Sequence, residues 1–244
     1  MSERLTGARI KALRRRSKYI LLDTDRDDVW LIHLGMSGRV TIGDQPPTAN
    51  FHHHRKNLEK HDHVFIGFDT GQSLIYNDPR RFGAMDIFGA AEEADHPLIK
   101  NLGPEPLGNR FNAEYLFAKL RGKKAPIKSA LLDQRIVAGL GNIYVCEALW
   151  RSGIHPKRLA GKIARPRIDI LTAHIRDVLA EAIAAGGSSL QDYRQADGEL
   201  GYFQHQFAAY GQEGTACSKS DCTGTIKRIV QSGRSSFFCN TCQR

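Results

Sequence analysis

The sequence predicts an α+β protein built from successive parts, and three observations support this prediction. Short apolar runs separated by Gly, Asp and Pro fill residues 1–95, a pattern typical of a β-sheet domain. Helical periodicity dominates residues 112–210, after a proline-punctuated linker at residues 96–111. Four of the five cysteines lie in residues 211–244, a segment too short to bury a core of its own.

Six apolar runs are the expected strands of the first part, which predicts a sheet or sandwich. They are residues 19–23, 29–34, 40–42, 63–68, 73–76 and 85–88. Residues 44–60 contain two prolines and three consecutive histidines, and we expect a loop there. A metal site is the less favoured alternative, because adjacent histidines rarely converge on one ion.

Four helices are expected in the second part. Their ranges are residues 112–120, 127–132, 142–152 and 165–185. Asn112 is a suitable N-cap for the first helix, and the pair Gly186-Gly187 is a suitable end for the last. Gly139 and Gly141 make a tight turn before the third helix, which Asn142 could cap.

The C-terminal cysteines form two close pairs whose spacing predicts a zinc site on a β-hairpin. The ligands are Cys217, Cys222, Cys239 and Cys242. Residues 225–230 and 234–238 are the expected strands, with a turn at residues 231–233. Two disulfides are the alternative, which is weaker in a chain without a secretory signal. The fifth cysteine, Cys146, is expected to be a small buried apolar residue.

A formal net charge of +9 favours a polyanionic partner, most simply nucleic acid. Seven cations lie between Arg4 and Lys18. No apolar run is long enough for a membrane span, and the first residues lack the apolar stretch of a signal peptide. We therefore expect an intracellular protein with a nucleic-acid partner; the family resemblance described below adds the expectation of a monomer in the bacterial cytoplasm that associates with the nucleoid through DNA.

Two glycine-rich turns are candidate contact sites. Asp78-Pro-Arg80-Arg81-Phe82-Gly83 should project two cations beside an aromatic ring, which suits a nucleic-acid backbone and a stacking wedge. The alternative is structural, with Asp78 capping the turn and Phe82 in the core. Met36 lies in a second turn and by default would also fill the core. Lys128 is a candidate phosphate ligand, whose alternative is an ordinary solvated lysine.

The motifs together resemble bacterial formamidopyrimidine-DNA glycosylase, the repair enzyme that excises 8-oxoguanine and ring-opened purines. In chain order they are Arg-Arg-Ser-Lys18-Tyr, His-Leu-Gly-Met36-Ser-Gly, Lys60-His-Asp-His, Asp-Pro-Arg-Arg81-Phe-Gly, Asn101-Leu-Gly-Pro-Glu-Pro-Leu, Gly-Leu-Gly-Asn142-Ile-Tyr, Ser152-Gly-Ile-His-Pro, Gly198-Glu-Leu-Gly-Tyr-Phe and the cysteine hairpin. The resemblance runs from Leu5 to Arg244. It implies a β-sandwich, a helix–two-turn–helix domain and one structural zinc ion.

The resemblance also implies residue roles on duplex DNA that contains oxidised purines or abasic sites. Met36, Arg80 and Phe82 match the side chains that fill the gap left by the everted nucleoside. The matches to backbone-phosphate ligands are Lys18, His61, Arg81, Lys128, Asn142 and Arg234. Residues 187–203 match the loop that closes over the flipped base. Glu199, where many relatives carry lysine, is a departure within that loop.

A second departure concerns the start of the chain. Family members begin Pro-Glu-Leu-Pro-Glu, and the proline amine attacks the deoxyribose C1′. This sequence begins Met1-Ser-Glu3 and lacks that nucleophile and its neighbouring acid, so the resemblance implies that the β-sandwich of residues 1–95 is incomplete and that catalysis is impaired. We weigh three explanations: a fragment or misplaced start of an ordinary glycosylase, a catalytically inactive damaged-DNA-binding protein, or a substitute amine on Met1 or Lys18 with Glu3 as the acid. In the family Lys18 has a supporting role only.

Other classes of protein fit less well. An RNA-binding protein with a zinc ribbon would have no evident use for Met36 together with Arg80 and Phe82. A small-molecule metalloenzyme is disfavoured because four thiolates close the zinc coordination shell.

Overall fold

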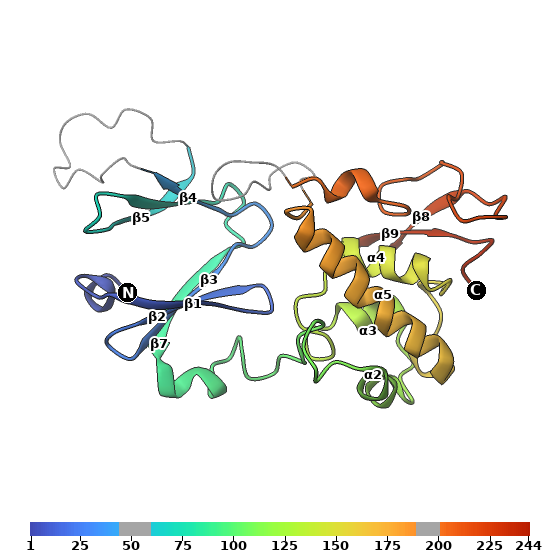
Figure 1. Ribbon diagram of the computed structural model, residues 1–244, viewed down its shortest axis with the longest axis horizontal. Coiled ribbons are helices and arrows are strands. Elements are labelled where there is room, and N and C mark those ends of the chain that lie inside the picture. Colours follow the sequence, from blue (N-terminus) through green and yellow to red (C-terminus); the bar gives the residue numbers. More distant parts are fainter. Residues whose placement is uncertain (44–59, 189–200) are drawn as a thin grey trace. The chain divides into compact units, whose positions relative to one another are not determined.

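A computed structural model of the chain describes residues 1–43, 60–188 and 201–244. The chain divides into two compact units (Figure 1). The first unit comprises Met1–Glu93 and Ala185–Gln204, and the second comprises Ala94–Ala184 and His205–Arg244. No helix in the described part of the chain is long and apolar enough to cross a membrane.

The first unit contains two antiparallel sheets. The order in the larger sheet is β1-β2-β3-β7, and in the smaller sheet it is β4-β6-β5. The bounds of these strands are β1 Ile10–Arg16, β2 Tyr19–Thr24, β3 Asp28–His33, β4 Arg39–Gly43, β5 Asp62–Gly67, β6 Ser73–Asn77 and β7 Ala84–Gly89. A short helix, α1 (Ser2–Leu5), precedes them, and a 3₁₀ helix, η1 (Ala90–Asp95), follows them.

Side chains of both sheets share one core. Leu22, Trp30 and Ile32 come from the larger sheet and Leu74 comes from the smaller sheet, and all four are buried in one cluster. Two sheets that bury their inner faces against each other form a sandwich. The predicted β-sandwich and six of its strands are therefore confirmed.

Strand β1 is the one strand among the described residues that the sequence pattern did not reveal. It pairs with β2, with Arg14 opposite Leu21, and almost all of its residues are exposed. An edge strand exposed on both faces needs no apolar alternation, and four of the seven residues of β1 are cations, so its sequence reads as a basic run. The Arg14 guanidinium donates to the carboxylates of Asp23 and Glu93, and these ion pairs raise its pKa.

The second unit is helical, and its helices lie close to the expected ranges. They are α2 Ala113–Leu120, α3 Ile127–Leu132, α4 Asn142–Arg151 and α5 Arg165–Ala184, with a short 3₁₀ helix, η2 Ala160–Lys162, between α4 and α5. Another 3₁₀ helix, η3 Phe203–Gln206, begins in the first unit and ends in the second. The predicted N-cap of α2 is confirmed, because the Asn112 side chain accepts from the Tyr115 N–H at 2.8 Å. The predicted cap of α4 is wrong: Gly141 is the N-cap and Asn142 is the first helical residue.

The predicted C-terminal hairpin is confirmed as β8 (Ile226–Gln231) and β9 (Arg234–Cys239). Its turn uses Ser232 and Gly233, both in the left-handed region with φ of 49° and 72°. Strand β9 packs against α4 (Figure 1). The hairpin therefore completes the helical unit rather than standing apart from it.

A buried carboxylate on α4 fixes the chain that leads into the hairpin. Glu147 is 1% exposed and accepts hydrogen bonds from the backbone N–H groups of Ala208, Ala209 and Tyr210 at 2.7–3.1 Å. Three donors on one carboxylate satisfy a charge that would otherwise be costly to bury.

We expect Glu147→Gln to lower the free energy of unfolding by about 2 kcal/mol, because an amide turns an N–H₂ group toward a backbone donor. Urea unfolding followed by circular dichroism measures this. Glu114→Gln, on the exposed side of α2, is the matched control and should cost less than about 1 kcal/mol. Equal losses in the two variants would contradict the assigned role.

Candidate nucleic-acid interface and metal centre

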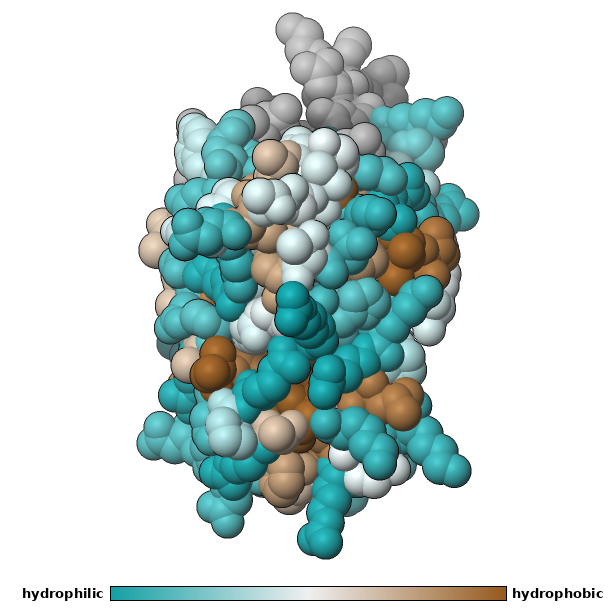
Figure 2. Space-filling model, turned by 90° about the vertical axis from the view of Figure 1, so that its right-hand side faces the viewer, coloured by the Kyte–Doolittle hydropathy of each residue, from teal (hydrophilic) through white to brown (hydrophobic). Residues whose placement is uncertain are grey.

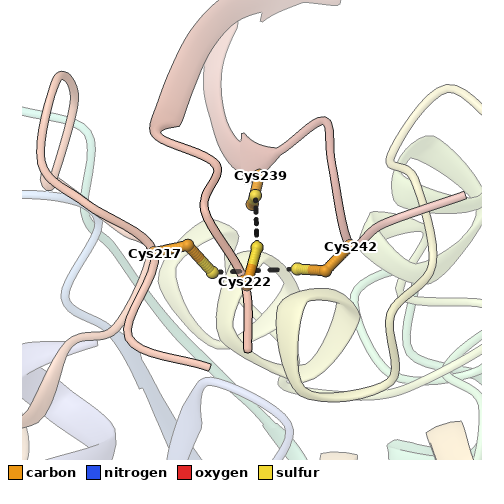
Figure 3. Close-up of side chains that lie close together, drawn as sticks. All are labelled: Cys217, Cys222, Cys239 and Cys242. Carbon is orange, nitrogen blue, oxygen red and sulfur yellow. Dashed lines mark hydrogen bonds between the residues drawn. The ribbon is translucent and has the colours of Figure 1, made fainter. Parts of the chain in front are cut away.

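The four C-terminal cysteines converge on one point (Figure 3). Their sulfur atoms all lie within 4.8 Å of one another. The Sγ atoms of Cys217 and Cys242 are 3.7 Å apart, and those of Cys222 and Cys239 are 3.6 Å apart. A disulfide would bring two sulfurs to about 2.05 Å, so the alternative of two disulfides is wrong.

These separations fit a zinc ion. Zn–S bonds of about 2.3 Å at a tetrahedral centre place the sulfurs about 3.8 Å apart. Burial raises the pKa of the Cys239 thiol, but hydrogen bonds from the backbone N–H groups of Cys242 and Thr241 outweigh burial and lower it to about 7. Burial and the neighbouring cysteines raise the pKa of the Cys242 thiol, so Cys239 is the thiol of this pair that ionises first. Four thiolates leave no open coordination position, so the zinc is structural.

The zinc centre is joined to α4 through Trp150. Its indole Nε1–H points at the Sγ of Cys217 at 3.4 Å, and the Lys219 ammonium lies 5.1 Å from the centre of its ring. Hydrogen bonds to thiolate ligands tune and orient a metal site. No feature of the sequence distinguished Trp150 from an ordinary core residue.

Lys128 is buried, so the alternative of a solvated lysine is wrong. It is 1% exposed, and its Nζ donates to the Ser235 carbonyl at 2.8 Å and the Ser236 hydroxyl at 2.6 Å. Desolvation lowers the pKa of Lys128, and the nearby charge of Arg234 lowers it further, against an opposite effect from Cys146. The helical unit therefore places a buried cation beneath the start of β9.

Asn142 reaches the same carbonyl from α4. Its Nδ2 donates to the Ser235 oxygen at 3.0 Å, while its buried Oδ1 has no hydrogen-bond partner among the described residues. Arg234, the residue before Ser235, is exposed at the end of the hairpin turn. The structure thus brings Lys128, Asn142 and Arg234 into one neighbourhood, through serines that the sequence did not single out.

Met36, Arg80 and Phe82 lie on two loops of the first unit and are exposed. Met36 is 69% exposed and Phe82 is 57% exposed, so the default expectation that they fill the core is wrong. The Arg80 guanidinium carbon stands 4.9 Å from the centre of the Phe82 ring. Two large apolar side chains and a stacked cation thus face solvent within one unit.

His61 and Arg81 occupy special backbone positions near these loops. Both have positive φ, 83° and 55°, a conformation uncommon for residues other than glycine. The Asp78 N–H donates to the His61 carbonyl, and the Arg81 N–H donates to the Asp78 carbonyl. Glu199 lies outside the described residues, as does most of the loop over residues 187–203.

Lys18 and Ser17 form the turn between β1 and β2, and Ser17 has a φ of 55°. Lys18 is exposed, and its charge acts on His33 at the end of β3. Burial first and Lys18 second lower the pKa of His33. Lys18 therefore belongs to the same unit as Met36 and Phe82, near the end of the strand that leads to Met36.

The helical unit has no extended apolar face on the side that Figure 2 displays. Hydrophilic side chains dominate that view, and the hydrophobic groups are small and separate. Broad apolar patches mark association surfaces.

The chain has basic loops, exposed apolar side chains that can act as wedges, and a closed thiolate site. These features place it in the class of zinc-containing DNA-binding proteins.

Comparisons with known proteins narrow this class. The model "Formamidopyrimidine-DNA glycosylase N-terminal domain" matches residues 1–85, the "Formamidopyrimidine-DNA glycosylase H2TH domain" matches residues 102–194, and "Zinc finger found in FPG and IleRS" matches residues 221–244. Formamidopyrimidine-DNA glycosylases of Ruegeria pomeroyi and Jannaschia sp. are 59% and 60% identical over the whole chain, which covers 86% of each.

Solved structures of formamidopyrimidine-DNA glycosylases are also similar to this chain. The Lactococcus lactis protein in complex with abasic-site DNA superposes with a TM-score of 0.88 at 35% identity, over 99% of this chain and 84% of that one. The Thermus thermophilus protein gives 0.84 at 38% identity, over 97% and 84%. The chain belongs to the formamidopyrimidine-DNA glycosylase family, whose members are DNA glycosylases of base-excision repair.

We expect the purified protein to hold one zinc ion per polypeptide, measured by elemental analysis. Cys239→Ala should lose the metal and with it the stability of the hairpin, because metal binding supplies folding free energy that so small a segment lacks. Cys146→Ala is the control and should keep the metal, since Cys146 is not among the four converging thiols. Retention of zinc by Cys239→Ala would contradict the assignment.

We expect Lys128→Met to change the free energy of unfolding at pH 7 by less than about 1 kcal/mol, because the lost hydrogen bonds offset a removed desolvation cost. The pKa of Lys128 is lower in the folded state, so the unfolded state binds the proton more tightly. As the pH increases from the folded-state pKa of Lys128 to about 10.4, the free energy of unfolding of the wild type should therefore rise relative to that of Lys128→Met.

Urea unfolding at pH 7 and at pH 10 tests this difference. Lys124→Met, an exposed lysine on the preceding loop, is the control and should show the wild-type dependence on pH. A Lys128→Met curve parallel to the wild-type curve would exclude a desolvated ammonium.

Proposed function

We propose that this chain acts on duplex DNA that contains oxidised purines, such as 8-oxoguanine and formamidopyrimidines, or abasic sites, as a DNA glycosylase and AP lyase. The observation that carries the proposal is the match to this family over the whole chain at 59% identity. The solved Lactococcus lactis relatives are complexes with abasic-site DNA and with Fapy-dG-containing DNA.

The exposed side chains of the first unit support base eversion. Flipping a nucleoside costs a few kcal/mol of stacking, and an inserted apolar wedge offsets part of this cost. Met36 and Phe82 are exposed apolar side chains on loops, and the Arg80 guanidinium lies over the Phe82 ring. We propose that these three residues fill the space that the everted nucleoside leaves.

The basic residues support phosphate contacts. Exposed Arg234 and Lys18 offer cations, and the Oδ1 of Asn142, which has no hydrogen-bond partner within residues 1–43, 60–188 and 201–244, marks an amide that can reorient toward a ligand. Buried Lys128 holds the hairpin backbone next to Arg234. We propose that Lys18, His61, Arg81, Asn142 and Arg234 hold the DNA backbone around the lesion, in a monomer. Lys128 contributes to these phosphate contacts from below, by holding the part of the hairpin that carries Arg234.

The chemical step requires a neutral amine that attacks C1′ of the deoxyribose, expels the damaged base and forms a Schiff base. An α-amino group has a pKa near 7.7–8.0 and supplies this amine far better than an ordinary lysine. We propose that a polypeptide that begins at Met1 binds damaged DNA without forming this Schiff base. Glycosylase and lyase activity is thus proposed for a protein that carries this amine, and a catalytically inactive damaged-DNA-binding protein is the second candidate, for a polypeptide that begins at Met1.

Borohydride trapping on an 8-oxoguanine duplex tests the chemistry. A polypeptide that starts at Met1 should bind abasic-site duplex weakly and give no trapped adduct, because it lacks the family's N-terminal proline amine. A chimera that carries the N-terminal segment of the Ruegeria pomeroyi relative before Met1 should give the adduct. A robust adduct from the Met1 polypeptide would show that another amine, of Met1 or Lys18, attacks the sugar.

A further inference from the structure

The two loops that carry Met36, Arg80 and Phe82 are forced together by the topology of the sandwich. Residues 34–38 lead from β3 to β4, and residues 78–83 lead from β6 to β7. His33 is opposite Ala84 in one sheet, and Arg39 is opposite Asn77 in the other. Both connections therefore cross between the same two pairs of neighbouring strands, at the same end of the sandwich.

The backbones of these loops are in direct contact. A Cβ atom on Gly35, whose φ is 67°, would lie 2.6 Å from the Phe82 carbonyl carbon. A Cβ atom on Gly38 or Gly83 would lie 2.8 Å or 1.7 Å from the hydroxyl of Tyr76. Only glycine fits at these positions, so the loops close around the end of the Tyr76 side chain.

Asp78 lies beneath this contact and is 1% exposed. Its Oδ1 accepts from the Ser37 hydroxyl at 2.7 Å, which belongs to the Met36 loop. Its Oδ2 accepts from the Gly83 N–H at 2.8 Å and from the Tyr76 hydroxyl at 3.1 Å. The Ser37 hydroxyl in turn accepts from the Arg80 N–H at 3.2 Å. One carboxylate thus joins both loops and strand β6.

The carboxylate is held in its ionised form. Burial would raise the pKa of Asp78, but the hydrogen bonds from Ser37, Gly83, Tyr76 and Arg80 outweigh burial and lower it. Burial and the bond to Asp78 raise the pKa of Tyr76 to about 12, so its hydroxyl stays a donor. An ionised carboxylate with three donors makes stronger bonds than a neutral acceptor.

We propose that Asp78 is the positioning residue for the wedge, and that it sets Met36 against Arg80 and Phe82 through its bonds to Ser37 and Gly83. The inference rests on the proposed binding of damaged DNA. Met36 and Phe82 are mostly exposed, so packing against a core does not fix their positions. The backbone of the two loops must therefore set where these side chains lie. Asp78 is buried, so in this proposal it acts through the two loops and not by contact with DNA or the reacting atoms.

If Asp78 served stability alone, its replacement would affect DNA binding differently. Its loss would weaken folding but leave the preference for damaged DNA unchanged in the molecules that remain folded. A positioning role predicts a lower ratio of abasic-site to intact duplex affinity. Intact duplex is bound mainly through backbone phosphates and needs no wedge, so it serves as the internal reference.

The test uses the full chain with Asp78→Asn, which keeps the shape but turns a donor toward donors, and Ser37→Ala, which removes one hydroxyl from the network. Asp69→Asn is the matched control, because Asp69 is exposed in the turn at the opposite end of β6 and its loss changes the net charge equally. Fluorescence anisotropy gives Kd for tetrahydrofuran and intact duplexes. A 2-aminopurine opposite the lesion reports wedge insertion.

Asp78→Asn and Ser37→Ala should lower the affinity ratio by about tenfold and reduce the 2-aminopurine response, as expected for the loss of one stacked contact. Asp69→Asn should change the ratio by less than about twofold. A wild-type ratio in either folded network variant would overturn the inference. If Asp78→Asn does not fold, Ser37→Ala decides. A wild-type chain that does not prefer tetrahydrofuran duplex would instead overturn the proposed function, and the inference with it.

Discussion

The helical unit depends on one constraint: the β8–β9 hairpin is too small to bury a core, so it must be held from outside. Four thiolates close one end of it around zinc, and Glu147 fixes the chain that leads into it. At the other end, Lys128 and Asn142 both bond the Ser235 carbonyl. The exposed Arg234 therefore stands on a strand held at both ends, which limits the conformational entropy it can lose on binding.

In the β-sandwich, too, exposed side chains must be held in place without a core around them, but here hydrogen bonds do what metal coordination does in the helical unit. Its exposed apolar side chains cannot be placed by burial, so a buried polar network places the backbone that carries them. The register of two strand pairs brings the loops together, and glycines permit their close approach. Metal coordination in one unit and a satisfied carboxylate in the other thus provide the rigidity that a hydrophobic core provides elsewhere in the chain.

Much of this architecture could be predicted from the sequence, because apolar periodicity and cysteine spacing report directly on burial and metal geometry. The helix over residues 127–132 and the hairpin agree with their expected positions. Strand β1 was not predictable by the same reasoning, since an exposed edge strand carries no apolar alternation. The burial of Lys128 also left no signal, because its partners are a carbonyl and a hydroxyl more than one hundred residues away.

Strand β1 has a consequence for how copies of this chain meet. An edge strand presents unpaired backbone groups that can recruit another strand, and cationic side chains oppose that approach. Lys11, Arg15 and Arg16 add cations to this edge of the described sheet, whereas the charge of Arg14 is balanced by the carboxylates of Asp23 and Glu93. Two such edges repel each other while each attracts a polyanion, so one feature of composition both discourages sheet-to-sheet aggregation and favours a nucleic-acid partner.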